Sequence, residues 1–213
     1  EDNATVPLHY ENRIPELQLT NEEFNEDMEA LLDEIALDEA EERAVEQEFS
    51  RQYHLLTRED RLDTIGEDIV DHFMNRGFMG KAMVISLDRP TAIRTYDKVR
   101  AHWQRRIDEL KEQRAQSTDS AEIDRLDDEI AYMEETDMAV VVSESQNEGE
   151  ELRKKGADIR PHRQRMKSED LDEKFKDPDD PLRIAFVCAK WTTGFDVQPC
   201  STIYRRRRER RAA

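Results

Sequence analysis

Apolar residues recur every three to four positions over several long stretches of the chain, with charged residues between them. Such stripes predict amphipathic helices that each bury one face. Capping residues or a first-turn proline mark where the helices begin, because they satisfy or remove N–H groups that the first turn leaves unpaired. The predicted helices begin at Thr20, Thr57, Pro90, Ser145 and Ser168. A polar break at residues 116–120 makes the third of them one arm of an antiparallel helical hairpin.

Other apolar runs are short and lack the helical spacing. They predict buried strands at residues 81–87, 138–143, 183–188 and 201–204. These strands alternate with helices along the chain, an order that is typical of α/β proteins. The sequence therefore predicts an α/β fold with a mostly parallel sheet that helices cover on both faces.

The same pattern divides the chain into three parts. Residues 1–56 are expected to form a connecting segment with an acidic helix. Residues 57–204 are expected to form the α/β domain, with the helical hairpin inserted near residues 91–135. Residues 205–213 contain a run of arginines whose mutual repulsion is expected to keep this tail disordered unless an acidic partner organises it.

The chain is strongly acidic, with 39% charged residues and a formal net charge of -18. This charge argues against non-specific nucleic-acid binding by the chain as a whole, although it is compatible with a local basic groove. No apolar run approaches the roughly 20 residues of a membrane span, and no signal peptide is recognisable, so we expect a cytoplasmic protein. Cys188 and Cys200 lack metal-binding spacing and are expected to be reduced thiols.

The most informative segment follows the predicted strand at residues 183–188. The strand stops at a turn with hydroxyls, a glycine and a carboxylate, Thr192-Thr193-Gly194-Phe195-Asp196. Because α/β proteins bind ligands beyond the carboxyl ends of their strands, the turn predicts a binding site at that edge of the sheet. Taken alone the signal is weak, since Gly and Asp also occur in turns for conformational reasons.

Several segments, in their order and spacing, give the chain a resemblance to a known family. They are residues 6–13 (VPLHYENR), 53–58 (YHLLTR), 68–73 (DIVDHF), 80–86 (GKAMVIS) and 193–196 (TGFD). From Val6 to Tyr204 the chain resembles the R subunit of type I restriction enzymes, the subunit that translocates and cleaves DNA.

The resemblance implies the second of two RecA-like lobes that grip ATP between them, preceded by the connection from the first lobe. Residues 83–86 resemble a motif of such motors, which makes Ser86 a DNA-contact candidate. Residues 188–196 resemble another motif, which touches DNA at its start and the nucleotide near its end. The nucleotide-side candidates are Thr193, Gly194 and Asp196. Of these, Asp196 would accept hydrogen bonds from ribose hydroxyls. Cys188 stands where related helicases often have Thr, so a hydroxyl contact to DNA phosphate is not expected there.

The resemblance also implies cofactors and partners. The full-length subunit would use ATP and Mg²⁺, and neither is expected to bind tightly to this chain. Its partners would be the first RecA-like lobe and the rest of the R subunit, the modification and specificity subunits, and double-stranded DNA. No membrane partner is expected.

Motifs that ATP hydrolysis and DNA cleavage need are missing from the sequence. Residues 77–81 (GFMGK) are followed by alanine and run into a strand, whereas a Walker phosphate-binding loop follows a strand and opens a helix. We find no Asp-Glu-x-His motif, no convincing nuclease trio and no Gln-x-x-x-Arg-x-x-Arg pattern, and we give the arginines of residues 205–213 no role at the γ-phosphate. We therefore assign no catalytic or metal-binding residue, and we expect a fragment of the motor that does not hydrolyse ATP by itself.

A basic island in this acidic chain is a second candidate site. It includes Arg153, Lys154, Lys155, Arg163 and Arg165. These side chains would contact DNA phosphates without reading bases if they folded beside the strand ends, and a solvated helix and loop is the alternative. Trp191 would either stack on a base or adenine, or serve in packing. For the whole chain, the alternative function is a non-catalytic acidic protein-interaction module.

Overall fold

The computed structural model describes residues 57–78, 80–145, 148–188, 191 and 195–205. A division between Arg61 and Leu62 separates the chain into two units, and the second unit is described here by itself. The acidic helix expected from Thr20 and residues 206–213 of the expected arginine-rich tail lie outside the described residues, whereas Arg205, the first residue of that tail, ends a strand. The predicted boundary after residue 56 therefore stays a prediction.

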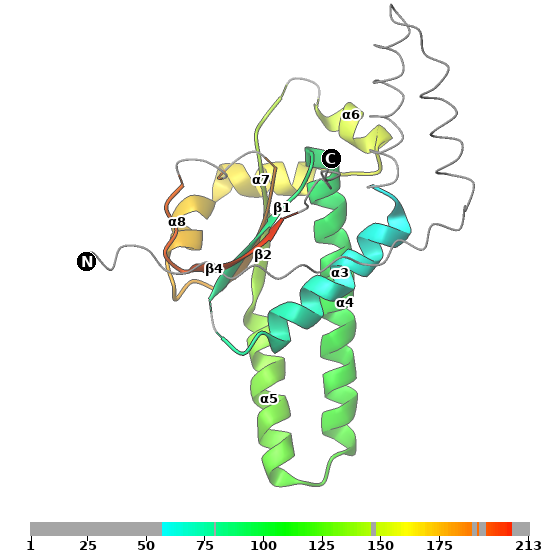
Figure 1. The fold of residues 1–213 in the computed structure, drawn as a ribbon, viewed down its shortest axis with the longest axis vertical. Coiled ribbons are helices and arrows are strands. Elements are labelled where there is room, and N and C mark those ends of the chain that lie inside the picture. Colours follow the sequence, from blue (N-terminus) through cyan, green and yellow to red (C-terminus); the bar gives the residue numbers. More distant parts are fainter. Residues whose placement is uncertain (1–56, 79, 146–147, 189–190, 192–194, 206–213) are drawn as a thin grey trace, which may run out of the picture. The chain divides into compact units, whose positions relative to one another are not determined.

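Parallel strands form one sheet in the order β2-β3-β1-β4 (Figure 1). The strands are β1 (Lys81–Ile85), β2 (Asp137–Val142), β3 (Leu182–Cys188) and β4 (Cys200–Arg205). The helices are α3 (Glu59–Asn75), α4 (Arg89–Gln116), α5 (Ser120–Glu135), α6 (Glu148–Lys154), α7 (Arg160–Ser168) and α8 (Leu171–Lys176). The predicted α/β class is confirmed, and the sheet is parallel throughout the residues that the structure describes.

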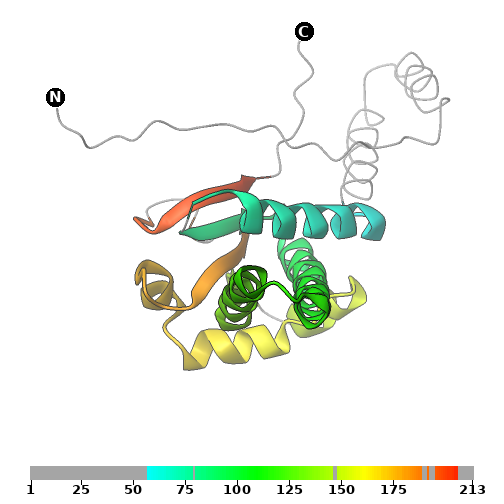
Figure 2. The ribbon, with the colours of Figure 1, turned by 90° about the horizontal axis from the view of Figure 1, so that it is seen from below.

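Each face of the sheet has its own core, because successive side chains of a strand point to opposite faces. On one face, Val84 and Phe186 pack among the apolar sides of α3, α4 and α5. On the other face, Met83 and Val187 pack against α8, whose Phe175 is fully buried. Figure 2 shows α3 and α4 on one side of the sheet and α8 on the other. Helices therefore cover both faces, as predicted.

A helical hairpin formed by α4 and α5 extends beyond the sheet (Figure 1). Asp88 begins α4, since its carboxylate accepts a hydrogen bond from a first-turn N–H at 2.9 Å. Asp119 begins α5 in the same way, at 3.0 Å. Between the two helices, the indole Nε1 of Trp103 donates to the carbonyl oxygen of Met133 at 3.0 Å. The predicted hairpin is confirmed.

The segment after α6 differs from its prediction. Helix α7 ends at Ser168, where the sequence predicts that a helix begins. The next helix, α8, begins after Asp170, whose carboxylate accepts a hydrogen bond from the Glu173 N–H at 3.1 Å. The correction has a physical reason, because Ser and Asp both cap helices well and Pro161 in the first turn favours a helix that runs through to Ser168.

Candidate functional site

The carboxyl ends of the parallel strands meet at one edge of the sheet, called the carboxyl edge below. Ser86 follows β1, and its N–H donates to the carbonyl oxygen of Val187 in β3 at 2.9 Å. The sulfur of Cys188, the last residue of β3, lies 3.8 Å from the carbonyl oxygen of Leu87. Burial raises the pKa of the Cys188 thiol, which keeps it protonated at neutral pH. The structure thus brings Ser86 and Cys188 together.

An ion cluster joins this edge to the segment that follows β2. Arg89, the first residue of α4, donates to the hydroxyl of Ser145 at 2.5 Å and to the Glu148 carboxylate at 3.3 Å. Glu148 also accepts hydrogen bonds from Arg163 at 2.7 and 2.9 Å. Burial acts to raise the pKa of Glu148, but the hydrogen bonds from Arg163 and the Ser145 N–H outweigh it and lower that pKa. The cluster ties α4, α6 and α7 together.

The two α7 arginines among the candidate DNA contacts bond to the protein itself. Arg163 donates to the carbonyl oxygen of Val142 at 3.2 Å, in addition to Glu148. Arg165 donates to the carbonyl oxygen of Met138 at 2.9 Å and pairs with two carboxylates. Both carbonyls belong to β2, an outer strand of the sheet, and such strands present unpaired backbone groups unless something covers them. These contacts occupy donors that a DNA phosphate would need.

The other basic candidates lie exposed around the C-terminal end of α6. They are Arg153, Lys154 and Lys155. Because α6 is 7 residues long and Glu148 is its first residue, these cations lie at the other end of the helix, roughly 10 Å from the ion cluster. The structure therefore separates the basic island into an exposed group on α6 and an internally bonded group on α7. Cations at the end of a helix also complement its dipole, so a solvated structural role stays open for them.

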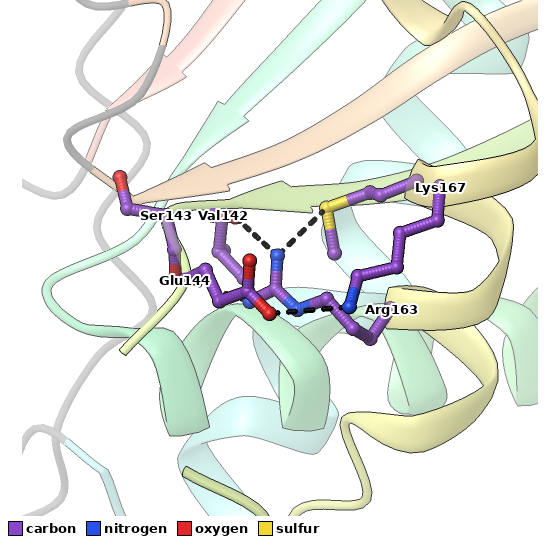
Figure 3. A pocket seen from close by; sticks show the side chains of 6 residues that line it. Val142, Ser143, Glu144, Arg163 and Lys167 are labelled. Carbon is purple, nitrogen blue, oxygen red and sulfur yellow. Dashed lines mark hydrogen bonds and ion pairs between the residues drawn. The ribbon is translucent and has the colours of Figure 1, made fainter. Parts of the chain in front are cut away.

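A hollow of about 380 Å³ opens at the end of β2 (Figure 3). Its lining consists of Val142, Ser143, Glu144, Arg163, Met166 and Lys167. The Lys167 ammonium lies 3.3 Å from the Glu144 carboxylate, and both side chains are exposed. Since exposed ion pairs are held weakly, Lys167 can exchange Glu144 for another anion.

Asp196 lies in the connection between β3 and β4, residues 189–199, of which the structure describes Trp191 and residues 195–199. Thr193 and Gly194 lie outside the described residues. The exposed carboxylate of Asp196 lines a hollow of about 460 Å³ together with Lys176, Pro178, Gln198 and Pro199. An anion and a cation therefore share this hollow.

The position of Asp196 differs from the prediction that the whole turn lies at the carboxyl edge. The carbonyl oxygen of Pro199 accepts a hydrogen bond from the Lys81 N–H at 2.8 Å, and Lys81 begins β1. The hollow around Asp196 therefore lies toward the amino edge. The reason is topological, since β4 runs parallel to β3 and the connection between them must return to the edge where β3 began.

Trp191 serves in packing, one of the two roles that the sequence allows for it. It is 8% exposed, and its ring stacks on the rings of both Phe175 and Phe195. The indole Nε1 donates to the carboxylate of Asp172 at 3.1 Å. These contacts and the burial of the indole favour packing over stacking on a base or an adenine.

Two classes of site find no support in the described part of the chain. Within residues 57–205, apart from the undescribed positions, no three His, Cys, Asp or Glu side chains come together as a metal site would require. Over the same residues, no helix has both the length and the apolar character of a membrane span.

Comparison with known proteins points to one class, the endonuclease subunits of type I restriction enzymes. The chain is 29% identical over 204 residues to the MjaIXP endonuclease subunit described for Methanocaldococcus jannaschii, an alignment that covers 94% of the chain. It is 26% identical over 207 residues, or 96% of the chain, to the HindI endonuclease subunit of Haemophilus influenzae. No family model and no solved structure matches the chain.

The resemblance that the sequence motifs carry is confirmed by these relatives. The chain is similar, over nearly its whole length, to a segment of the R subunits of type I restriction enzymes. It spans 16% of the length of each of the two relatives.

Sequence reasoning misses the partners of the candidate residues. It does not identify Lys176 as a cation that lines the same hollow as Asp196, although Lys176 ends the helix before β3 and Asp196 lies in the connection after it. It also misses Arg89 and Glu148 as a pair, because they are far apart in the sequence and each begins a helix. A charged residue at the first position of a helix that follows a strand is the signal that both share.

Proposed function

We propose that this chain is part of the DNA-translocating motor of a type I restriction enzyme, where it supplies one wall of the nucleotide cleft and part of the DNA track. The observation that carries the proposal is the similarity to two R subunits over nearly the whole chain. The parallel sheet supports it, since it is compatible with a RecA-like lobe. ATP and Mg²⁺, the first lobe, the modification and specificity subunits and a cytoplasmic location belong to the same proposal.

The DNA side of the proposal rests on the carboxyl edge. Ser86 and the exposed Arg153, Lys154 and Lys155 belong to elements that the ion cluster of Arg89 and Glu148 holds together. Cations that neutralise phosphates bind the DNA backbone without sequence preference, as a motor that moves along DNA requires. Arg163 and Arg165 would support this surface through their bonds to β2.

The nucleotide side rests on the connection between β3 and β4. Its carboxylate, Asp196, would accept hydrogen bonds from ribose hydroxyls, and the nearby Lys176 would attract phosphate oxygens. The connection begins at Cys188 on the proposed DNA side and ends beside this hollow. The sequence has no Walker phosphate-binding loop, so we expect no ATP turnover by the chain alone.

The test is binding of the 213-residue chain to duplex DNA of unrelated sequences over a range of salt concentrations. For the double variant Arg153→Glu/Lys154→Glu we expect weaker binding and a log–log salt slope that is smaller by about 2, since each lost phosphate contact removes about 0.9. The matched control is Arg100→Glu/Arg105→Glu, which makes the same charge change at exposed positions of α4. Equal weakening by the two double variants would overturn the DNA track at α6.

A further inference from the structure

Three aromatic rings and one hydrogen bond hold the described part of the β3–β4 connection on α8. The ring centroid of Trp191 lies 5.4 Å from that of Phe175 at an interplanar angle of 22°, and 4.3 Å from that of Phe195 at 10°. Offset stacking at such distances is favourable beyond the apolar area that it buries. The indole Nε1 adds a directional bond to Asp172, also in α8.

The backbone of Trp191 adopts a conformation that its residue type disfavours. Its φ is 65°, in the left-handed region where a Cβ clashes with the following carbonyl oxygen. Among the described residues, no other non-glycine residue has a positive φ. A bulky residue keeps such a conformation only where its surroundings enforce it. The ring stack and the bond to Asp172 are contacts that can do so.

The stack reaches from the core of the sheet to the hollow that contains Asp196. At one end, the buried Lys81 lies with its ammonium 5.7 Å from the centre of the Phe175 ring. At the other end, the ammonium of Lys176 lies 5.4 Å from the centre of the Phe195 ring. Both distances are within the range of cation–π attraction. Lys176 and Asp196 line the same hollow, so the outer end of the stack borders the candidate nucleotide site.

We propose that Trp191 is a positioning residue, which locks the connection onto α8 and thereby holds Asp196 beside Lys176. The functional consequence of this inference rests on the proposed nucleotide role of Asp196. The locking of the connection does not depend on that role. The indole is the central ring of the stack, and Phe195 immediately precedes Asp196. Removing the central ring frees Phe195 and with it the carboxylate.

Hydrogen exchange of two backbone amides in the 213-residue chain tests the locking. The N–H groups of Lys81 and Cys200 donate to the carbonyl oxygens of Pro199 and Val197, so their protection reports whether the connection stays in place. In Trp191→Ala we expect the exchange rates of these two reporter amides to rise by a factor at least tenfold larger than the factor for amides in the middle of α5. In Trp191→Phe we expect most of the protection to remain, because a ring still fills the stack.

The glycine variant separates the ring from the backbone. Trp191→Gly also removes the indole, but glycine adopts a positive φ without strain. We expect the reporter amides to exchange as fast in Trp191→Gly as in Trp191→Ala. Protection in Trp191→Gly equal to that of the unchanged chain would overturn the proposal, because the turn alone would then hold the connection. Equal acceleration of the reporter amides and of α5 in Trp191→Ala would also overturn it, since that result indicates global destabilisation only.

Calorimetric titration of the same chain with Mg-ADP tests the nucleotide role separately. We expect weak binding that falls at least fivefold in Asp196→Asn and in Trp191→Ala. Binding that is the same in Asp196→Asn and in the unchanged chain would overturn the nucleotide assignment of Asp196. The exchange of the reporter amides would still decide the role of Trp191.

Discussion

The two tryptophans of the chain show how differently its two sheet faces are built. Trp103 and Trp191 are almost equally buried, at 4% and 8% exposure, and each indole donates one hydrogen bond. Trp103 sits in a long helix with ordinary backbone geometry and packs near Phe73 of α3. Trp191 sits in a connection with a positive φ and packs on the six-residue helix α8.

The difference indicates that one face of the sheet determines the stability of the unit and the other the position of Asp196. The face with Trp103 joins α3, α4 and α5 to the sheet in one large core, so its side chains stabilise the whole unit. The face with Trp191 is covered by α8 and by the connection that carries Asp196. A change on the first face should therefore act globally, and a change on the second face locally.

The largest expected effect is that of Trp103→Ala. It removes a large buried side chain from the main core and should lower the free energy of unfolding by about 3–5 kcal/mol. Urea unfolding followed by circular dichroism measures this loss. The amides that exchange only when the whole unit unfolds should all exchange faster by the same factor. Trp103→Phe, which keeps most of the apolar volume, is the control. A loss below about 1 kcal/mol in Trp103→Ala would contradict the contrast between the two faces.

The contrast between fixed and replaceable contacts extends to the charged residues after β2. The side chains of Glu148 and Arg163 are 11% and 14% exposed, whereas those of Glu144 and Lys167 are 62% and 65% exposed. We expect Glu148→Gln to cost about 2–3 kcal/mol, because it leaves partly buried arginines without a counter-charge. The matched Glu144→Gln should cost less than about 0.5 kcal/mol. Similar losses in the two variants, measured by urea unfolding, would show that burial does not distinguish these pairs.

A smaller effect than those of Trp103→Ala and Glu148→Gln is expected from His162, which packs edge-on against Tyr96 of α4 with ring centroids 4.7 Å apart. Burial lowers the pKa of His162 from 6.5 to about 4, and the positive charge of Arg165 adds to this while Asp158 opposes it. Between these pH values the unfolded chain binds a proton that the folded chain does not. The neutral His162 therefore contributes its full amount to the free energy of unfolding above pH 6.5, and this contribution is lost as the pH falls toward 4.

Because the imidazole is partly solvated, we expect this loss to be only about 1–2 kcal/mol between pH 7 and pH 4.5. The measurement is urea unfolding of the chain and of His162→Gln at both pH values. The variant cannot bind the proton, so the stability difference between the two proteins should change with pH by that amount. A difference that stays constant would mean that His162 titrates alike in the folded and unfolded states.

Much of the fold follows from local sequence patterns. The strands and the hairpin are predictable because their apolar spacing, the first-turn Pro90 and the break at residues 116–120 all agree. The cap of α8 is not predictable in this way, since Ser168 and Asp170 are two residues apart and both suit the position. Only the packing of α7 decides between them.

The candidate site is less predictable than the fold, because it depends on which distant residues meet. The sequence identifies Asp196 as a candidate but not the edge on which it lies, which follows from the direction of β4. It identifies a basic island, but whether an arginine faces solvent or bonds to β2 depends on the tertiary position of α7. Arg153 and Arg165 look equivalent in the sequence, yet one is exposed and the other pairs with two carboxylates.

The arginines of α7 have a consequence for how the sheet meets other molecules. An incoming β-strand adds to a sheet by bonding to the backbone of an outer strand. At β2 it would find the carbonyl groups of Met138 and Val142 already taken by Arg165 and Arg163. These two bonds therefore oppose the pairing of β2 with a strand of another molecule.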